Sequence, residues 1–345
     1  MKVGKNMYES ISYEESLKLS GDKIYIDLRS PSEFKKFTIP NSINIPILND
    51  EERKVVGTLY HNGEYGEAKA KGVEFVSKKL PEMFRRYLKL NDEYKYIIIF
   101  CARGGYRSSA VAGFLHSLGL RVYKINGGYK KYRQFIMKTI DQSLDQIDFI
   151  TIYGNTGTGK TKVLNHIKEL GYDILDLERY ANHMGSFLGS VGKGEPNSQK
   201  TFESLLAEDI INRKGKIFFL EGESKKIGKA VIPDKIYNKM INSRKIKLNS
   251  DIDFRIKNIL EDYVVEDDDE LKIAIKKLKR YISSKKVDEY INLIDRKEYE
   301  EVIKDLCLNY YDPMYENRER KFIKEYENYD NYKMAETIIS DFIRD

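Results

Sequence analysis

The strongest constraint on the fold of this chain is one glycine-rich run, Gly154-Asn155-Thr156-Gly157-Thr158-Gly159-Lys160-Thr161. The run matches the pattern G-x-x-x-x-G-K-[ST], which joins a buried strand to the start of a helix. A β-branched and aromatic segment at 149–153 precedes it, and Val163, Leu164 and Ile167 follow at helical spacing. This part of the chain is therefore expected to be an α/β domain with a parallel sheet.

The same eight residues predict a phosphate-binding loop. Their glycines allow several backbone N–H groups to point at one anion, and the N-terminus of the following helix adds positive potential. We expect Lys160 to contact the outer phosphate and the Thr161 hydroxyl to ligate Mg²⁺. The pattern indicates a diphosphate or triphosphate, and it does not indicate which group the phosphates carry.

Further functional groups are expected where the neighbouring strands end, because parallel strands present their carboxyl ends at one edge of a sheet. Four acids occupy such positions, namely Asp176, Glu178, Glu221 and Glu223. For each of them a salt bridge to a lysine such as Lys225 or Lys226 is the alternative role. His183 is a candidate acid, base or phosphate ligand, and a structural histidine bonded to the backbone is its alternative.

A second loop carries a lone thiol at the end of an apolar run. Cys101 follows Ile97-Ile98-Ile99-Phe100 and begins a loop whose candidate anion-binding residues are Arg103, Gly104, Gly105, Arg107 and Ser108. Inward-turned amides and two arginines favour the thiolate over the thiol, so we expect an accessible nucleophile or a carrier of a transferable chalcogen atom. The other cysteine, Cys307, lies among apolar residues and is interpreted as a core residue.

The spacing from Cys101 to Arg107 is C-x5-R, and two chemistries use such a loop. A phosphatase uses the thiolate to attack phosphorus while the arginine holds the phosphoryl oxygens, and a sulfurtransferase uses it to carry sulfur or selenium. A buried core cysteine is the structural alternative.

Length and composition indicate two globular domains. The chain has 345 residues, of which 41% are hydrophobic and 33% charged. We expect an α/β domain at 1–140, with strands at 23–28, 94–100 and 121–125 and a helix at 108–118. A second α/β domain is expected at 146–345, with strands at 149–153, 173–177 and 216–220 and a helical, charged pattern from Asp251 to the end.

No apolar run approaches the roughly 20 residues that a membrane span needs, and the first residues lack a secretory pattern. A cytoplasmic protein without a membrane partner is expected. A basic helix could nevertheless bind RNA: Leu271, Ile275, Leu278 and Ile282 share one face, and Lys272, Lys276, Lys279 and Arg280 lie around it with no acid between them. A solvated charged face is the alternative.

The motifs occur in an order that resembles one known family. Segments 27–34 and 39–46 resemble rhodanese signatures, and they precede the thiol loop at 101–108 and the run Asn126-Gly127-Gly128-Tyr129-Lys130. The phosphate loop follows, and then come segments 175–178, 183–186, 198–203, 221–228 and 311–315. In this order and spacing, from about residue 24 to 316, the chain resembles the tRNA 2-selenouridine synthases.

The resemblance implies a rhodanese-like parallel-sheet domain followed by a P-loop NTPase-like domain with a helical C-terminal part. It implies that selenium from selenophosphate replaces the sulfur of wobble-position 2-thiouridine in a tRNA anticodon, after S-geranylation by geranyl diphosphate. Cys101 matches the cysteine thought to carry selenium, and the phosphate loop would hold a diphosphate, either geranyl diphosphate or a nucleotide. A selenophosphate-producing enzyme is an implied partner. Simple thiosulfate sulfurtransferase activity is disfavoured, because the histidine usual near Thr38 is missing.

Two other functions stay open at this point. One is a rhodanese-fold phosphatase with a P-loop nucleotidase module, which would release phosphate from aryl phosphates at Cys101. The other is a non-catalytic RNA-binding adaptor, which would tolerate the loss of that thiol. The sequence leaves open the tRNA species, the oligomeric state, the orientation of the domains, and whether selenation or geranylation dominates.

Overall fold

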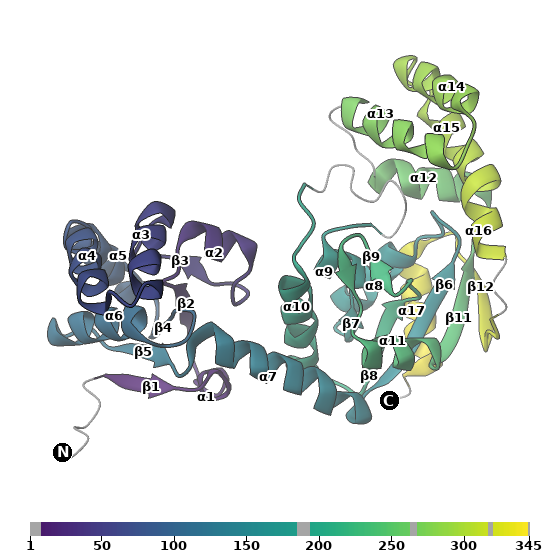
Figure 1. Ribbon diagram of the computed structural model, residues 1–345. Coiled ribbons are helices and arrows are strands. Elements are labelled where there is room, and N and C mark those ends of the chain that lie inside the picture. The colour runs from purple at the N-terminus through teal and green to yellow at the C-terminus, as the bar shows by residue number, and fades with distance from the viewer. Residues whose placement is uncertain (1–7, 185–193, 263–267, 317–319, 344–345) are drawn as a thin grey trace. The chain divides into compact units, whose positions relative to one another are not determined.

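The computed structural model describes residues 8–184, 194–262, 268–316 and 320–343 (Figure 1). The chain divides into two compact units, Met1–Lys138 and Thr139–Asp345. The division falls inside helix α7 (Gly128–Ser143). Among the described residues, no helix has the length and apolar character that crossing a membrane requires.

The first unit is built on a five-stranded parallel sheet in the order β1-β5-β4-β2-β3. The strands are β1 (Glu9–Ile11), β2 (Lys23–Asp27), β3 (Ile43–Asn44), β4 (Tyr96–Phe100) and β5 (Val122–Ile125). The three strands expected at 23–28, 94–100 and 121–125 are confirmed as β2, β4 and β5. All three are almost fully buried, as expected for a parallel sheet covered on both faces.

Helices cover both faces of this sheet, because successive side chains of a strand point to opposite faces. Ile24 and Ile26 of β2 face the main core, whereas Tyr25 between them meets Tyr13 of α1 on the other side, with ring centroids 5.6 Å apart. The helices are α1 (Tyr13–Leu17), α2 (Pro31–Lys36), α3 (Asp50–His61), α4 (Tyr65–Ser77), α5 (Leu80–Glu93) and α6 (Tyr106–Ser117). Capping boxes begin α1, α2 and α3, and α6 confirms the helix expected at 108–118.

The second unit has a five-stranded parallel sheet in the order β12-β11-β6-β8-β7. Its strands are β6 (Asp148–Gly154), β7 (Ile174–Leu175), β8 (Ile217–Glu221), β11 (Arg244–Asn249) and β12 (Lys324–Glu327), and β9 (Lys226–Ile227) pairs antiparallel with β10 (Ala230–Val231). The expectation of an uninterrupted helical pattern from Asp251 onwards is wrong at β12. This edge strand buries only Tyr326 of its four residues, so it has no apolar run that could reveal it.

The helices of the second unit form two groups. Those around the sheet are α8 (Lys160–Glu169), α9 (Leu177–Ala181), α10 (Gln199–Ile211), α11 (Asp234–Ile241) and α17 (Asn331–Phe342). The remaining helices are α12 (Ile252–Asp262), α13 (Asp268–Lys277), α14 (Ser284–Asp295), α15 (Tyr299–Leu306) and α16 (Asp312–Glu316), with a π-helical turn at Cys307–Tyr311. A core of their own, around Ile275, Val287 and Ile294, stabilises α13 to α15.

Candidate functional site

The thiol loop joins β4 to α6 and is held from behind by the first turn of α7. The backbone N–H of Tyr129 donates to the Cys101 carbonyl at 2.9 Å, and that of Lys130 donates to the Ala102 carbonyl at 3.0 Å. Lys124 of β5 adds a hydrogen bond to the Gly104 carbonyl at 3.3 Å. These carbonyls therefore point toward α7 and β5, away from the side where an anion would bind.

Two glycines permit this close backbone packing. Gly128 has φ of +54°, and a Cβ atom there would lie 2.2 Å from the Cys101 carbonyl oxygen. Gly104 has φ of +64°, and its Cβ atom would lie 2.8 Å from the Gly127 nitrogen. Any larger residue would push the two segments apart. The glycines at 127–128, known from the sequence only as part of a motif, therefore set the position of the thiol loop.

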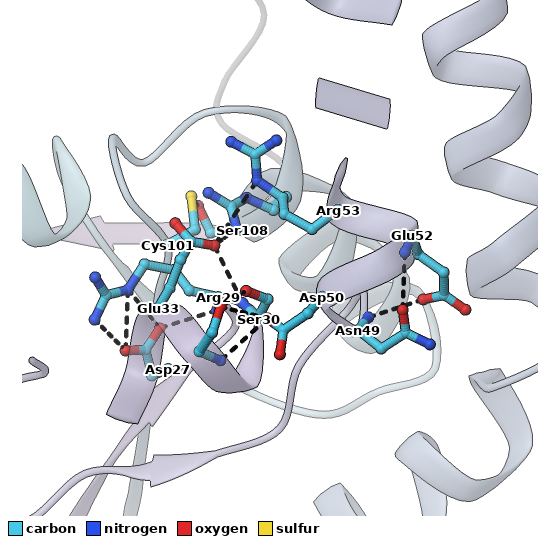
Figure 2. Close-up of polar contacts among 12 residues, drawn as sticks. Asp27, Arg29, Ser30, Glu33, Asn49, Asp50, Glu52, Arg53, Cys101 and Ser108 are labelled. Carbon is cyan, nitrogen blue, oxygen red and sulfur yellow. Dashed lines mark hydrogen bonds and ion pairs between the residues drawn. The ribbon is translucent and has the colours of Figure 1, made fainter. Parts of the chain in front are cut away.

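The thiol itself lies deeper than the sequence suggests. Cys101 is 3% exposed, and its Sγ atom lies 3.2 Å from the Ser108 hydroxyl (Figure 2). The expectation of an openly accessible thiolate is wrong for this conformation, because β4 and α6 carry the side chain into the edge of the main core. Gly104 is half-buried, whereas Arg103 and Gly105 are exposed on the loop.

Arg107 is only partly available to an external anion. Its Nη1 atom lies 2.8 Å from Glu33 Oε2. Arg53 Nε lies 3.8 Å from the same oxygen, and Figure 2 shows Glu33 and Arg53. Burial opposes the charged carboxylate, but the hydrogen bond and charge of Arg107 prevail and lower the pKa of Glu33. Glu33 and Arg53 are members of this site that the sequence did not identify, although Glu33 lies in the rhodanese-like segment 27–34.

The phosphate loop leads from β6 to α8 as predicted, with Gly159 in the left-handed region at φ of +85°. Three side chains from distant parts of the unit bind its carbonyls: Arg255 Nε on Thr156 at 2.8 Å, Asn258 Nδ2 on Gly157 at 2.9 Å, and Asn328 Nδ2 on Thr158 at 2.9 Å. Because these carbonyls are held from outside the loop, they are directed away from the side where a phosphate would bind. The sequence did not identify any of these three side chains.

Lys160 and Arg255 complete the setting of the loop. Lys160 Nζ donates to the carbonyls of Gly154 at 3.0 Å and Asn155 at 3.2 Å. The ammonium group that is predicted to bind the outer phosphate therefore lies over the loop. Arg255 is 5% exposed and forms two hydrogen bonds, at 2.9 and 2.7 Å, with the carboxylate of Asp312. Asp312, which belongs to the motif at 311–315, therefore orients the Arg255 side chain that binds the phosphate loop.

Three of the predicted acids meet beside the loop. One carboxylate oxygen each from Glu178, Glu221 and Glu223 lies within 4.8 Å of the others, and Glu178 Oε2 lies 3.5 Å from the Thr161 hydroxyl. Burial raises the pKa of Glu221 to about 7 and also raises that of Glu223, while Lys160 acts in the opposite direction. Oxygen ligands of this kind, buried with excess negative charge, fit Mg²⁺ well.

This cluster makes the stability of the second unit depend on pH. Between the ordinary glutamate pKa near 4.5 and about 7, the folded state holds a proton at Glu221 that the unfolded state has lost. In the presence of a metal chelator, the free energy of unfolding should therefore fall as the pH rises through this window, by on the order of 3 kcal/mol. Glu221→Gln should remove this loss and raise the melting temperature at pH 8, whereas Glu336→Gln on the exposed face of α17 should not. Identical wild-type and Glu221→Gln pH profiles would contradict the expectation.

The other two candidates near this edge have different surroundings. Asp176 caps α9, accepting from the Arg179 backbone N–H at 2.9 Å, and it is not a member of the three-carboxylate cluster. Burial raises its pKa. The His183 ring packs against Gly228, where a Cβ atom would lie 2.8 Å from His183 Cδ2. Burial lowers the pKa of His183, which favours the neutral ring.

The basic helix is partly neutralised. Asp295 lies 2.5 Å from Lys272 and Asp288 lies 3.7 Å from Lys279, both acids belonging to α14. The sequence places no acid between these cations, but α14 packs beside α13 and supplies the two acidic partners. The expectation of one helix that includes Leu278 and Ile282 is wrong, because α13 ends at Lys277 and a 3₁₀ turn at Leu278–Arg280 follows it. Lys276 and Arg280 are exposed and form no ion pair with any residue that the structure describes.

Each of the two units matches a known protein-family model. A family model described as "Rhodanese-like domain" matches residues 12–135, and one described as "tRNA 2-selenouridine synthase AAA domain" matches residues 147–292. The chain is 35% identical to a tRNA 2-selenouridine synthase of Nitrosomonas europaea, covering 71% of this chain and 64% of the relative. It is also 35% identical to that of Pseudomonas fluorescens, covering 71% of this chain and 67% of the relative. The matches thus span about two thirds of these relatives' length.

One solved structure is similar to a single part of the chain. It is the N-terminal domain of a Clostridium difficile 630 protein titled as ATP/GTP binding, with 40% sequence identity and a TM-score of 0.37. The match covers 37% of this chain and 99% of that domain.

Proposed function

Since the chain belongs to the tRNA 2-selenouridine synthase family, we propose that it is a transferase that replaces the sulfur of wobble-position 2-thiouridine in tRNA with selenium. The observation that carries this proposal is the presence, in one chain, of a clamped thiol loop and a phosphate loop beside three carboxylates. A non-catalytic RNA-binding adaptor needs neither loop. A rhodanese-fold phosphatase with a P-loop nucleotidase module would contain both, and the family to which the chain belongs favours the synthase over it. Selenophosphate and geranyl diphosphate are the proposed co-substrates, and a selenophosphate-producing enzyme would supply the first.

The proposed reaction has two steps. In the first, the thiocarbonyl sulfur attacks C1 of geranyl diphosphate, so that a C–S bond forms, pyrophosphate leaves with the electron pair of the C–O bond, and N3 of the base loses its proton. In the second, selenium replaces the sulfur at C2, and S-geranyl-2-thiouridine, hydrogen selenophosphate and water give 2-selenouridine, geranylthiol and hydrogen phosphate. Alkylation helps this step because a thiolate leaves more readily than sulfide.

We assign the second step to the thiol loop, where selenophosphate would be held beside Cys101 and would deliver its selenium to C2 without a covalent S–Se bond to the protein. The overall exchange needs no oxidant, whereas a covalent S–Se bond at Cys101 would require a two-electron oxidation of selenide and its later reversal. Mass spectrometry of the intact protein after exposure to selenophosphate distinguishes covalent carriage from an anion held in the loop. Because Cys101 is 3% exposed, the donor has to be small or the loop has to open.

We assign the first step to the phosphate loop, which would hold the diphosphate of geranyl diphosphate. Lys160 would move from the loop carbonyls to the outer phosphate, and Arg255, Asn258 and Asn328 keep the amides of the loop directed at it. Thr161, Glu178, Glu221 and Glu223 would hold Mg²⁺, which neutralises charge on the leaving diphosphate. A nucleotide is the competing occupant, and a measured preference for ATP or GTP would favour it.

We propose that the tRNA backbone contacts Lys276 of α13 and Arg280 of the 3₁₀ turn that follows it (Leu278–Arg280), two exposed cations that form no ion pair with any described residue. The double charge reversal Lys276→Glu/Arg280→Glu should weaken tRNA binding and reduce the salt dependence, the slope of log K against log salt, by about two. Lys272→Glu/Lys279→Glu is the matched control, with a smaller effect because these lysines are already paired. If the two double variants weaken tRNA binding equally, the assignment of the contact to Lys276 and Arg280 is wrong.

The whole proposal is tested by mass analysis of nucleosides from thiolated tRNA incubated with the protein. Geranyl diphosphate alone should give S-geranyl-2-thiouridine, and both co-substrates together should give 2-selenouridine. Folded protein that changes no thiouridine would refute the proposal. Phosphate release from an aryl phosphate at Cys101 would instead support the phosphatase alternative.

A further inference from the structure

The first unit contains an apolar cavity that neither proposed step has used so far. It has a volume of about 670 Å³ and lies among α3, α4, α5 and α6. Its walls are mainly aliphatic and aromatic, with Val56, Val76, Met83 and Phe114 among them. Cavities of roughly 300–1,000 Å³ with such walls are typical of sites that enclose small apolar ligands.

The rim of this cavity exposes large apolar side chains to solvent. Val73 is 69% exposed, Tyr106 is 67% exposed and Tyr60 is 40% exposed, and all three line the cavity. The rings of Tyr60 and Tyr106 lie 6.3 Å apart, and Lys69 Nζ lies 5.4 Å from the Tyr106 ring. Large apolar side chains exposed together at the lining of one cavity are typical of a binding surface.

The cavity and the thiol share the first turns of α6. Arg107 and Ser109 line the cavity, and Ser108 between them contacts Cys101 Sγ at 3.2 Å. A molecule reacting at the thiol loop therefore has an apolar space within one helical turn of the reacting atoms. Lys69 and Arg107 add positive charge to this lining, which suits an apolar chain attached to an anionic carrier.

We propose that this cavity binds the ten-carbon isoprenoid chain of the S-geranylated tRNA nucleotide while selenium replaces the sulfur. The inference rests on the proposed function, in which the alkylated sulfur has to reach Cys101 with its chain still attached. The chain is apolar, its carrier is a polyanion, and both properties match the walls and the charged lining. The bond between C2 and sulfur breaks, the chain stays on the sulfur, and geranylthiol then leaves the cavity.

The test compares two anticodon stem-loops, one with S-geranyl-2-thiouridine and one with S-methyl-2-thiouridine, as substrates for selenium exchange. Each buried methylene group is worth roughly fourfold in affinity, so even partial burial of the longer chain should lower its KM at least about thirtyfold relative to the methyl substrate. Gly72→Leu places a side chain in the cavity, since a Cβ atom at Gly72 has no atom within 4 Å. In this variant the ratio of the KM for the S-methyl substrate to the KM for the S-geranyl substrate should fall to nearly one.

Gly66→Leu is the matched control, because Gly66 lies on the same helix, has equally open surroundings and does not line the cavity. It should keep the wild-type discrimination. A direct readout is calorimetric titration with S-geranyl-2-thiouridine 5′-monophosphate, whose binding Gly72→Leu should weaken at least about tenfold.

The outcomes separate the two proposals. If the wild type exchanges neither alkylated substrate, the proposed function fails. If it exchanges both with equal KM, and Gly72→Leu changes neither KM nor the titration, the cavity proposal alone is overturned. A change in the sedimentation of Gly72→Leu, without any change in nucleotide binding, would identify the cavity as a protein interface and would also overturn it.

Discussion

Cys101→Ser should abolish selenium incorporation into tRNA, with a loss of at least about 10³-fold, while S-geranylation continues. The serine hydroxyl fits the same space and keeps a polar contact to Ser108, so the loop held by Tyr129 and Lys130 should persist. A serine hydroxyl, however, is a weaker nucleophile than a thiol and interacts poorly with selenium. The measurement is nucleoside mass analysis starting from S-geranylated stem-loop RNA and selenophosphate.

Cys307→Ala serves as the control for this experiment, because it removes the other buried thiol from the second unit. It should leave selenium incorporation from pre-geranylated RNA in place. Undiminished selenation by folded Cys101→Ser would show that the thiol does not take part in the exchange. Cys101 would then have only a structural role.

Lys160→Ala should reduce S-geranylation at least about 100-fold, the second largest effect that the structure predicts. Lys160 is the only cation that the phosphate-loop motif itself provides, and its Nζ atom lies at 3.0 and 3.2 Å from two loop carbonyls, ready to exchange these contacts for phosphate oxygens. Selenation of pre-geranylated RNA should survive, because that step is assigned to the other unit. Geranylation is measured with radiolabelled geranyl diphosphate.

Lys168→Ala is the matched control, since it removes the same charge from an exposed position on the same helix α8. It should change the rate less than about twofold. If Lys160→Ala geranylates normally but fails to selenate pre-geranylated RNA, the phosphate loop serves the second step, and the assignment of steps to units is reversed.

Local patterns in the sequence were enough to predict what neighbouring residues build. The phosphate loop, the thiol loop, the strands β2, β4, β5, β6 and β8, and the two-unit architecture all follow from short-range order. In these cases the physical cause, whether a glycine-permitted turn or a buried β-branched run, acts within about ten residues. The grouping of Glu178, Glu221 and Glu223 was also predicted, although it joins distant segments, because parallel strands end at one edge of a sheet; Asp176, predicted with them, is not a member of the cluster.

Only the tertiary structure decided the rest, because the deciding contacts join distant residues. Asn328 binds the Thr158 carbonyl across 170 positions, and Glu33 meets Arg107 across 74. The burial of Cys101, the neutralisation of Lys272 by Asp295, and the apolar cavity likewise depend on which helices pack together. Sequence alone determined which chemical groups this protein possesses, and packing determined which of them are paired, covered or left free to act.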